Sequence, residues 1–221
     1  MSLKKSKGNM YPWVTHMHCH LGGECSHKCV TRFGRPERYN GPLRLIEEEF
    51  KVKYGSGKII FMEHRNDLFA EDVPDVFIHQ IINHCRMYPA NFYVFQTKNP
   101  ARYLTTGRLI PLNSILGTTI ETNRIMLDIS QAPCPTVRML AMEKLEARKF
   151  VTIEPIMDFD VDILVNWIAR IKPEFVNIGA DSKGHNLPEP SWEKVEALIN
   201  GITKMGIEIR EKHNLQRLMV K

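Results

Sequence analysis

The first predicted strand and the loop that follows it, residues 13–29, read WVTHMHCHLGGECSHKC. Residues 16–29 alone hold three of the five cysteines and four of the nine histidines of this 221-residue chain. Thiolate and imidazole groups are strong ligands of soft and borderline metals, so this density indicates a metal or iron–sulfur site. The candidate donors are Cys19, Cys25, Cys29, His16, His18, His20 and His27.

The composition fits one α/β domain, because 43% apolar residues in a chain of this length supply one sizeable core. No run of about 18 apolar residues is present, and the basic N-terminus lacks the apolar stretch of a signal peptide. We therefore expect a cytoplasmic protein with no membrane segment, in which clustered cysteines bind a metal and form no disulfides. The net charge of +5 permits an anionic partner but does not indicate nucleic-acid binding.

Short runs rich in β-forming residues alternate with amphipathic runs along the chain, which is typical of repeated βα units. The predicted strands are 13–18, 58–63, 91–97, 114–122, 149–156 and 174–180, and the predicted helices are 43–53, 75–88, 136–148, 161–171 and 191–205. This alternation predicts an α/β fold with one domain over residues 13–221, in which parallel strands form a closed or partial barrel. Residues 1–12 are expected to form a basic, disordered N-terminal extension.

Polar side chains follow the predicted strands at the points where the strands end. In a parallel barrel these strand ends lie on one rim, which is where active sites of such folds are assembled. The cysteine and histidine segment follows the first strand and therefore belongs to the same rim. The other strand-end residues include Glu63, Asn66, Asp67, Gln96, Lys98, Glu121, Arg124, Glu154, Asp158, Asp160 and Asp181.

The residues alone leave three metal sites open. Cys19, Cys25 and Cys29 suit a four-iron cluster with one open iron, and the same thiolates with one histidine suit structural zinc. Alternatively, His16 and His18 lie on one side of the first strand, because side chains alternate with period two. That pair is typical of a divalent-metal hydrolase, to which Asp181 could add a ligand.

Several segments together resemble the radical S-adenosylmethionine (radical SAM) superfamily, and more narrowly an uncharacterised branch found in phages and prokaryotes. They are residues 25–29, 67–74, 96–102, 119–123, 153–160 and 178–182, and the resemblance extends from about Trp13 onward. It implies a single-domain partial (β/α)6 barrel of the TIM type with parallel strands. It also implies a [4Fe-4S] cluster on Cys25 and Cys29, with Cys19 as a provisional third ligand, and S-adenosylmethionine on the open iron. An active enzyme of this kind takes an electron from a donor protein and forms a 5′-deoxyadenosyl radical, which removes hydrogen from a substrate that the sequence does not identify.

One departure from the family pattern concerns the third cysteine. Family cysteines are separated by three and then two residues, so the third position falls on Arg32. A guanidinium stays protonated and cannot replace a thiolate. Either Cys19 or a histidine such as His27 fills the position, or the chain is a non-catalytic relative that binds a ligand or partner.

The resemblance also implies roles for the strand-end residues. Glu63, Asn66 and Asp67 are expected to bind the amino group of S-adenosylmethionine. The ribose and carboxylate are assigned to Gln96, Lys98, Glu121 and Arg124, Glu154 completes the cofactor-binding set, and Asp158, Asp160 and Asp181 contact substrate or cap helices. The basic run around Arg32, Arg35, Arg38 and Arg44 is either a phosphate-binding or a solvated loop.

Overall fold

A computed structural model describes residues 3–8, 10–31, 37–182 and 184–220, so Arg32 and Arg35 lie outside the described residues. The main sheet is eight-stranded, with the hydrogen-bonded order β1-β2-β5-β6-β7-β8-β9-β10. Its strands are β1 (Lys4–Lys5), β2 (His16–His18), β5 (Ile59–Met62), β6 (Phe92–Thr97), β7 (Ser114–Thr119), β8 (Lys149–Ile153), β9 (Phe175–Ile178) and β10 (Glu208–Glu211). All neighbouring pairs from β2 to β10 are parallel, and only β1 is antiparallel.

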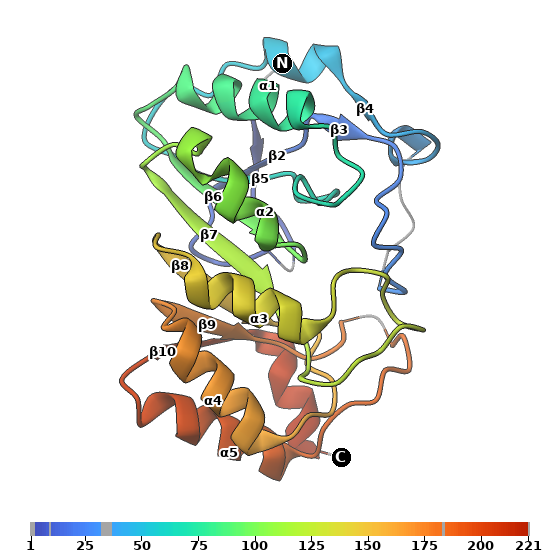
Figure 1. Cartoon of the computed structure of the whole chain (residues 1–221), viewed down its shortest axis with the longest axis vertical. Coiled ribbons are helices and arrows are strands. Elements are labelled where there is room, and N and C mark those ends of the chain that lie inside the picture. The colour runs from blue at the N-terminus through green and yellow to red at the C-terminus, as the bar shows by residue number, and fades with distance from the viewer. Residues whose placement is uncertain (1–2, 9, 32–36, 183, 221) are drawn as a thin grey trace.

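The helices lie along one face of this sheet, in chain order from one edge to the other (Figure 1). They are α1 (Asp75–Arg86), α2 (Ala101–Thr106), α3 (Pro135–Lys144), α4 (Val161–Ile171) and α5 (Trp192–Thr203). Short 3-10 helices cover Glu37–Tyr39, Glu47–Lys51, Gly107–Leu109 and His213–Val220, and β3 (Leu21–Gly22) pairs with β4 (Arg44–Leu45) in a small second sheet. The prediction of a parallel α/β fold is confirmed. The sheet does not close into a barrel among the described residues, because no ladder joins β10 to β1 or β2.

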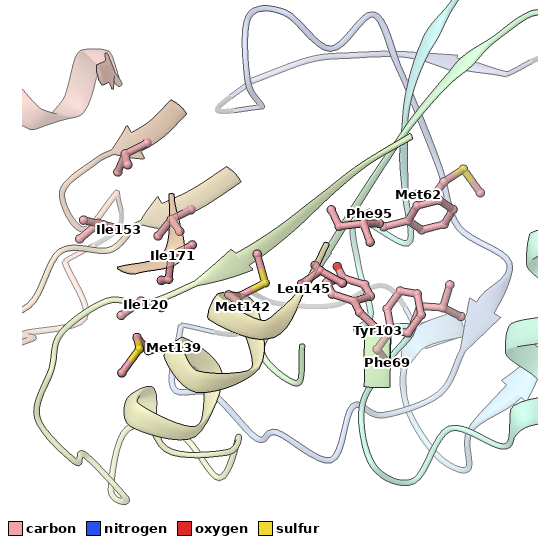
Figure 2. Packing of buried hydrophobic residues seen from close by; sticks show 14 of the residues in the cluster. Met62, Phe69, Phe95, Tyr103, Ile120, Met139, Met142, Leu145, Ile153 and Ile171 are labelled. Atoms are coloured by element: carbon pink, nitrogen blue, oxygen red, sulfur yellow. The ribbon is translucent and has the colours of Figure 1, made fainter. Parts of the chain in front are cut away.

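Alternate residues of each strand form the core between sheet and helices. Figure 2 shows Met62 and Phe95 from the strands packed with Phe69 and Tyr103, while Met142 of α3 lies between this group and Ile153. These strand residues face the helices because successive side chains of a strand point to opposite faces. Most of the core side chains are less than 10% exposed, so the helix-covered face is closed to ligands.

The opposite, inner face of the sheet carries a second apolar cluster formed by Tyr11, Val14, Phe61, Val94, Ile115, Phe150 and Phe175. The Phe150 ring fills the inner face so tightly that a Cβ on Gly117 would lie 2.2 Å from it. Trp13 packs edge-on against Phe150 and Phe175, with ring centroids 5.9 and 5.4 Å away. The segment before β2 therefore covers one end of the inner face.

The N-terminal extension differs from the expected disordered segment. Lys4 and Lys5 pair with Met17 and His16 in an antiparallel ladder, and Tyr11 is only 5% exposed. The Tyr11 hydroxyl lies 2.8 Å from both Gln96 Oε1 and the Thr152 hydroxyl. The aromatic residues explain the difference, because their apolar surface gains more from burial on the inner face than the lysines lose by being ordered beside it.

Most predicted elements coincide with observed ones, with boundaries that shift by a few residues. The helix predicted over 43–53 is wrong: Arg44–Leu45 is a strand, and only Glu47–Lys51 is helical, in the 3-10 form. The pairing of Leu45 with Leu21, which lie far apart in sequence, overrides the local helical spacing. Prediction missed α2 and β10, which are short.

No helix in the described ranges is long and apolar enough to cross a membrane.

Candidate functional site

A large pocket of about 1600 Å³, hereafter the central pocket, opens at the carboxyl ends of the parallel strands. Its lining comes from the loops after β2, β5, β6, β8 and β9, together with the N-terminal segment. The lining includes the polar residues Cys25, Cys29, Glu63, Asn66, Asp67, Gln96, Lys98, Glu154, Asp181, His185 and Lys212. Parallel strands bring their ends together, which explains why residues from such distant parts of the sequence meet here.

The proposed site residues divide into two groups. Eight line the central pocket: Cys25, Cys29, Glu63, Asn66, Asp67, Gln96, Lys98 and Glu154. Cys19, Glu121 and Arg124 do not line it. Arg124 forms ion pairs with Asp158 and Asp160 at the surface, so carboxylates outside the pocket balance its positive charge.

Asp67 fixes the loop that carries the cysteines, residues 19–31, which we call the cysteine loop. Its Oδ2 accepts hydrogen bonds from His27 Nε2 at 2.9 Å and from the Lys98 amide at 2.7 Å. Its Oδ1 accepts from the Thr97 hydroxyl at 2.6 Å and from the Phe69 amide at 3.0 Å. Burial alone raises the pKa of Asp67, but the hydrogen bonds and charge of His27 outweigh it and the pKa is lowered. Both oxygens are therefore occupied by the protein itself.

Glu63 has a similar role at the start of the cysteine loop. Its Oε1 accepts from the amide and ring of His20, at 2.7 and 2.9 Å, and its Oε2 accepts from the Leu21 amide at 3.0 Å. Burial opposes ionisation, yet the His20 contacts lower the pKa of Glu63 overall. Beside it, the Asn66 amide donates to the Leu21 and Gly23 carbonyls, both at 3.3 Å. These contacts make Glu63 and Asn66 positioning residues for the loop in this conformation.

Gly23 is required where the cysteine loop passes close to another segment. Its φ is +85°, and a Cβ there would lie 2.1 Å from the Pro42 carbonyl oxygen. Only glycine adopts this conformation and leaves room for the neighbouring backbone. The glycine at position 23 is thus required by the close approach of Pro42.

Cys29 lies against a chain of charged groups. Lys98 Nζ is 3.4 Å from Cys29 Sγ and also forms an ion pair with Glu121, whose other oxygen is 2.7 Å from Arg138 Nη1. Burial alone raises the pKa of Glu121, but Lys98 and Arg138 lower it to about 2. Burial alone lowers the pKa of Lys98, but the charges of Glu121 and Cys29 outweigh burial, so the pKa of Lys98 is raised overall. Glu121 thus positions Lys98 and does not reach the pocket.

The three cysteines proposed as ligands have different surroundings. Cys25 is 9% exposed, and burial together with the Asp67 charge raises the pKa of its thiol to about 11. Cys29 lies 3.1 Å from the Ser130 hydroxyl. Cys19 contacts His64 Nδ1 at 3.1 Å and the Arg65 amide at 3.3 Å, outside the pocket lining. The structure brings Cys25 and Cys29 to one pocket and does not add Cys19 to them.

Two further side-chain pairs line the central pocket. Glu154 forms a 2.9 Å ion pair with Lys212, and Asp181 accepts from His185 Nδ1 at 2.6 Å. Sequence reasoning missed Lys212 and His185, as it missed Arg138 and Tyr11. None of them lies in a motif: Lys212 follows the unpredicted β10, and Arg138 is a buried cation inside a helix.

The hydrolase alternative does not fit the orientation of β2. Met17 lines the central pocket, so its neighbours His16 and His18 point to the other face. His18 lies 3.7 Å from Glu49 Oε2, and burial and the neighbouring His20 lower its pKa to about 4. These two imidazoles therefore lie away from the strand-end pocket.

A family model described as "Protein of unknown function (DUF5131)" matches residues 13–200. The chain belongs to the DUF5131 family. A search of curated proteins found no match for this DUF5131 chain.

Solved structures of spore photoproduct lyase, a radical SAM enzyme, share the fold of this DUF5131 chain. A mutant of that lyase and its complex with dinucleoside spore photoproduct each have a TM-score of 0.65 and 8% identity, covering 92% of this chain and 78% of that chain. A mutant with bound AdoMet and dinucleoside spore photoproduct has a TM-score of 0.58 and 8% identity, covering 92% and 66%. At this identity the likeness establishes the fold alone.

The [4Fe-4S] cluster that such a fold implies can be tested against the residues present. A cluster with one open iron needs three thiolates at one place. The central pocket offers Cys25 and Cys29, and the described part of the chain contains no group of three or more His, Cys, Asp or Glu side chains arranged to hold a metal ion. Residues 32–36, which lie outside the description, contain no cysteine. The donor set does not fit the cluster.

Proposed function

We propose that the central pocket binds S-adenosylmethionine, and that this chain is a ligand-binding protein of the radical SAM fold. The observation that carries the proposal is the meeting of Cys25, Cys29 and Lys98 with Glu154 in one pocket at the strand ends. The fold supports it too, because a structural neighbour carries bound AdoMet. Since two thiols do not make a three-thiolate cluster site, no radical step is assigned to this chain.

The residues proposed to contact S-adenosylmethionine are Lys98, Glu154 and Gln96, whose side chains line the central pocket. Lys98 supplies an ammonium group for the methionine carboxylate, since charge-assisted hydrogen bonds to carboxylates are among the stronger polar contacts. Glu154 supplies a carboxylate for the amino group or the ribose hydroxyls. Gln96 also lines the pocket and is oriented by hydrogen bonds with the Tyr11 hydroxyl at 2.8 Å and the Thr119 hydroxyl at 2.9 Å.

Isothermal titration of the purified chain with S-adenosylmethionine tests this function. Glu154→Gln and Lys98→Met are each expected to weaken binding about tenfold or more, which corresponds to about 1.4 kcal/mol. Glu174→Gln and Lys194→Met are matched controls, because their ion pairs with Arg148 and Asp158 lie outside the pocket. Absence of binding by the wild-type chain at millimolar S-adenosylmethionine, or equal loss in the controls, contradicts the proposal.

A further inference from the structure

A group of exposed cations surrounds the opening of the central pocket. The structure places Lys4, Lys5, Lys7, Lys28 and Arg65 in the pocket lining, and all of them are exposed. We call these five residues the basic mouth. The first three come from the N-terminal segment, which β1 anchors beside β2. Residues from three separate parts of the sequence thus place positive charge around one opening.

The basic mouth carries charge that carboxylates do not balance. Over the described ranges, none of its five members forms an ion pair. Arginines on the outer surface are different: Arg148 pairs with Glu174 at 2.8 Å and Arg170 with Glu143 at 2.7 Å. Uncompensated charge of one sign around a pocket raises the local concentration of oppositely charged molecules.

The carboxylates of the central pocket offset the basic mouth only in part, because the lining holds four of them against seven lysines and arginines. Asp67 accepts from His27, Asp181 from His185, and Glu154 from Lys212. Glu63 accepts hydrogen bonds from its own loop. Because the five cations are exposed and Glu63 and Asp181 are buried, an entering molecule meets the cations at the opening first.

The pocket volume leaves room for a second molecule. Pockets for single small ligands usually measure about 300–1,000 Å³, whereas the central pocket measures about 1600 Å³. S-adenosylmethionine therefore fills only part of it. Because exposed cations line the same pocket, the second molecule is expected to be anionic where it leaves the pocket.

We propose that the basic mouth binds the phosphodiester backbone of a single-stranded nucleic acid, one base of which enters the central pocket. A concave site reaches a base only when the base is unstacked, and extrusion from a duplex costs a few kcal/mol. A single strand presents phosphates and unstacked bases together, which matches a cationic opening over a deep pocket. This inference rests on the proposed function only in that both molecules share one pocket.

Fluorescence anisotropy with a fluorescein-labelled oligothymidylate of about 12 nucleotides tests the inference, since one binding module covers about 4–16 nucleotides. The measurement is made without S-adenosylmethionine over roughly 50–200 mM salt. Each phosphate contact adds about 0.7 to the slope of log affinity against log salt for single strands. Replacing Lys4, Lys5 and Lys7 together by Gln is expected to reduce the slope by about 2.

The triple Gln substitution of Lys53, Lys144 and Lys204 is the matched control, because these lysines are exposed and lie outside the pocket lining. It is expected to leave affinity and slope unchanged. Failure of the wild-type chain to bind the oligonucleotide, tighter binding of the corresponding duplex, or equal slopes for the two triple variants would overturn the inference. Failure of S-adenosylmethionine titration alone would overturn the proposed function and leave this result standing.

Discussion

Asp67 and His27 are joined by a 2.9 Å hydrogen bond between Oδ2 and Nε2, which ties the end of β5 to the middle of the cysteine loop. The same carboxylate accepts from Thr97 and the Lys98 amide at the end of β6. One side chain therefore sets the position of Cys25 and Cys29 relative to two strand ends. The order of this loop comes from protein contacts.

Asp67→Asn is expected to destabilise the protein, because an amide nitrogen in place of Oδ2 leaves His27 and the Lys98 amide without their acceptor. Loss of buried hydrogen bonds to a charged group costs about 2–3 kcal/mol. Urea unfolding followed by circular dichroism measures the change. Asp72→Asn, which alters one exposed contact with Ser26, is expected to cost less than about 1 kcal/mol. Equal effects of the two substitutions would argue against a special role for Asp67.

The Glu121 carboxylate should make stability depend on pH in the acid range. Lys98 and Arg138 lower its pKa to about 2 against the opposing effect of burial. A lowered native pKa stabilises the fold at pH values above the unfolded pKa near 4.5, and this contribution is lost as the pH falls toward 2.

The test compares wild type with Glu121→Gln in urea unfolding at a series of pH values. The wild type is expected to lead by an amount on the order of 3 kcal/mol at pH 6, with the difference shrinking between about pH 4.5 and 2. Comparing the two chains at each pH removes the effects of the other carboxylates. A difference that stays constant with pH would show that Lys98 and Arg138 do not stabilise the ionised form of Glu121 over its protonated form.

Trp13→Ala is expected to destabilise the chain by about 3 kcal/mol, the usual cost of deleting a packed aromatic side chain. The reason is the loss of contacts with Phe150 and Phe175 on the inner face of the sheet. Thermal unfolding measures the loss, and Leu112→Ala, at a fully exposed side chain, is the control expected to change little. A loss as small as that of the control would contradict the packing of Trp13 on the inner face.

Anaerobic reconstitution with iron and sulfide is expected to yield far less than one [4Fe-4S] cluster per chain, because only Cys25 and Cys29 reach the central pocket. Hydrogen exchange of the cysteine loop is expected to be the same before reconstitution and after chelation, since Glu63 and Asp67 hold the loop. Iron and sulfide analysis with visible absorbance is the measurement. A full cluster that is lost in Cys19→Ala would mean that Cys19 moves to join the other two thiols.

Much of the fold follows from local sequence. The apolar spacing of 161–171 predicts a helix that the structure has as Val161–Ile171, and the strand runs coincide with β5 to β9 within a few residues. The helix predicted over 43–53 failed because a long-range pair, Leu21 with Leu45, decides that segment. Periodicity records which residues can be buried together locally and carries no information on distant pairing.

The sequence by itself determined a parallel α/β fold and drew attention to Cys25, Cys29 and the strand-end polar residues, because parallel strands place their ends together. Only the tertiary structure decided which of those groups face the pocket. Strand alternation turns His16 and His18 away, and Lys98 and Arg138 enclose Glu121. Burial of Tyr11 and Trp13 brings the N-terminal lysines to the pocket opening. Such outcomes depend on contacts between residues distant in sequence, and those contacts exist only once the chain has folded.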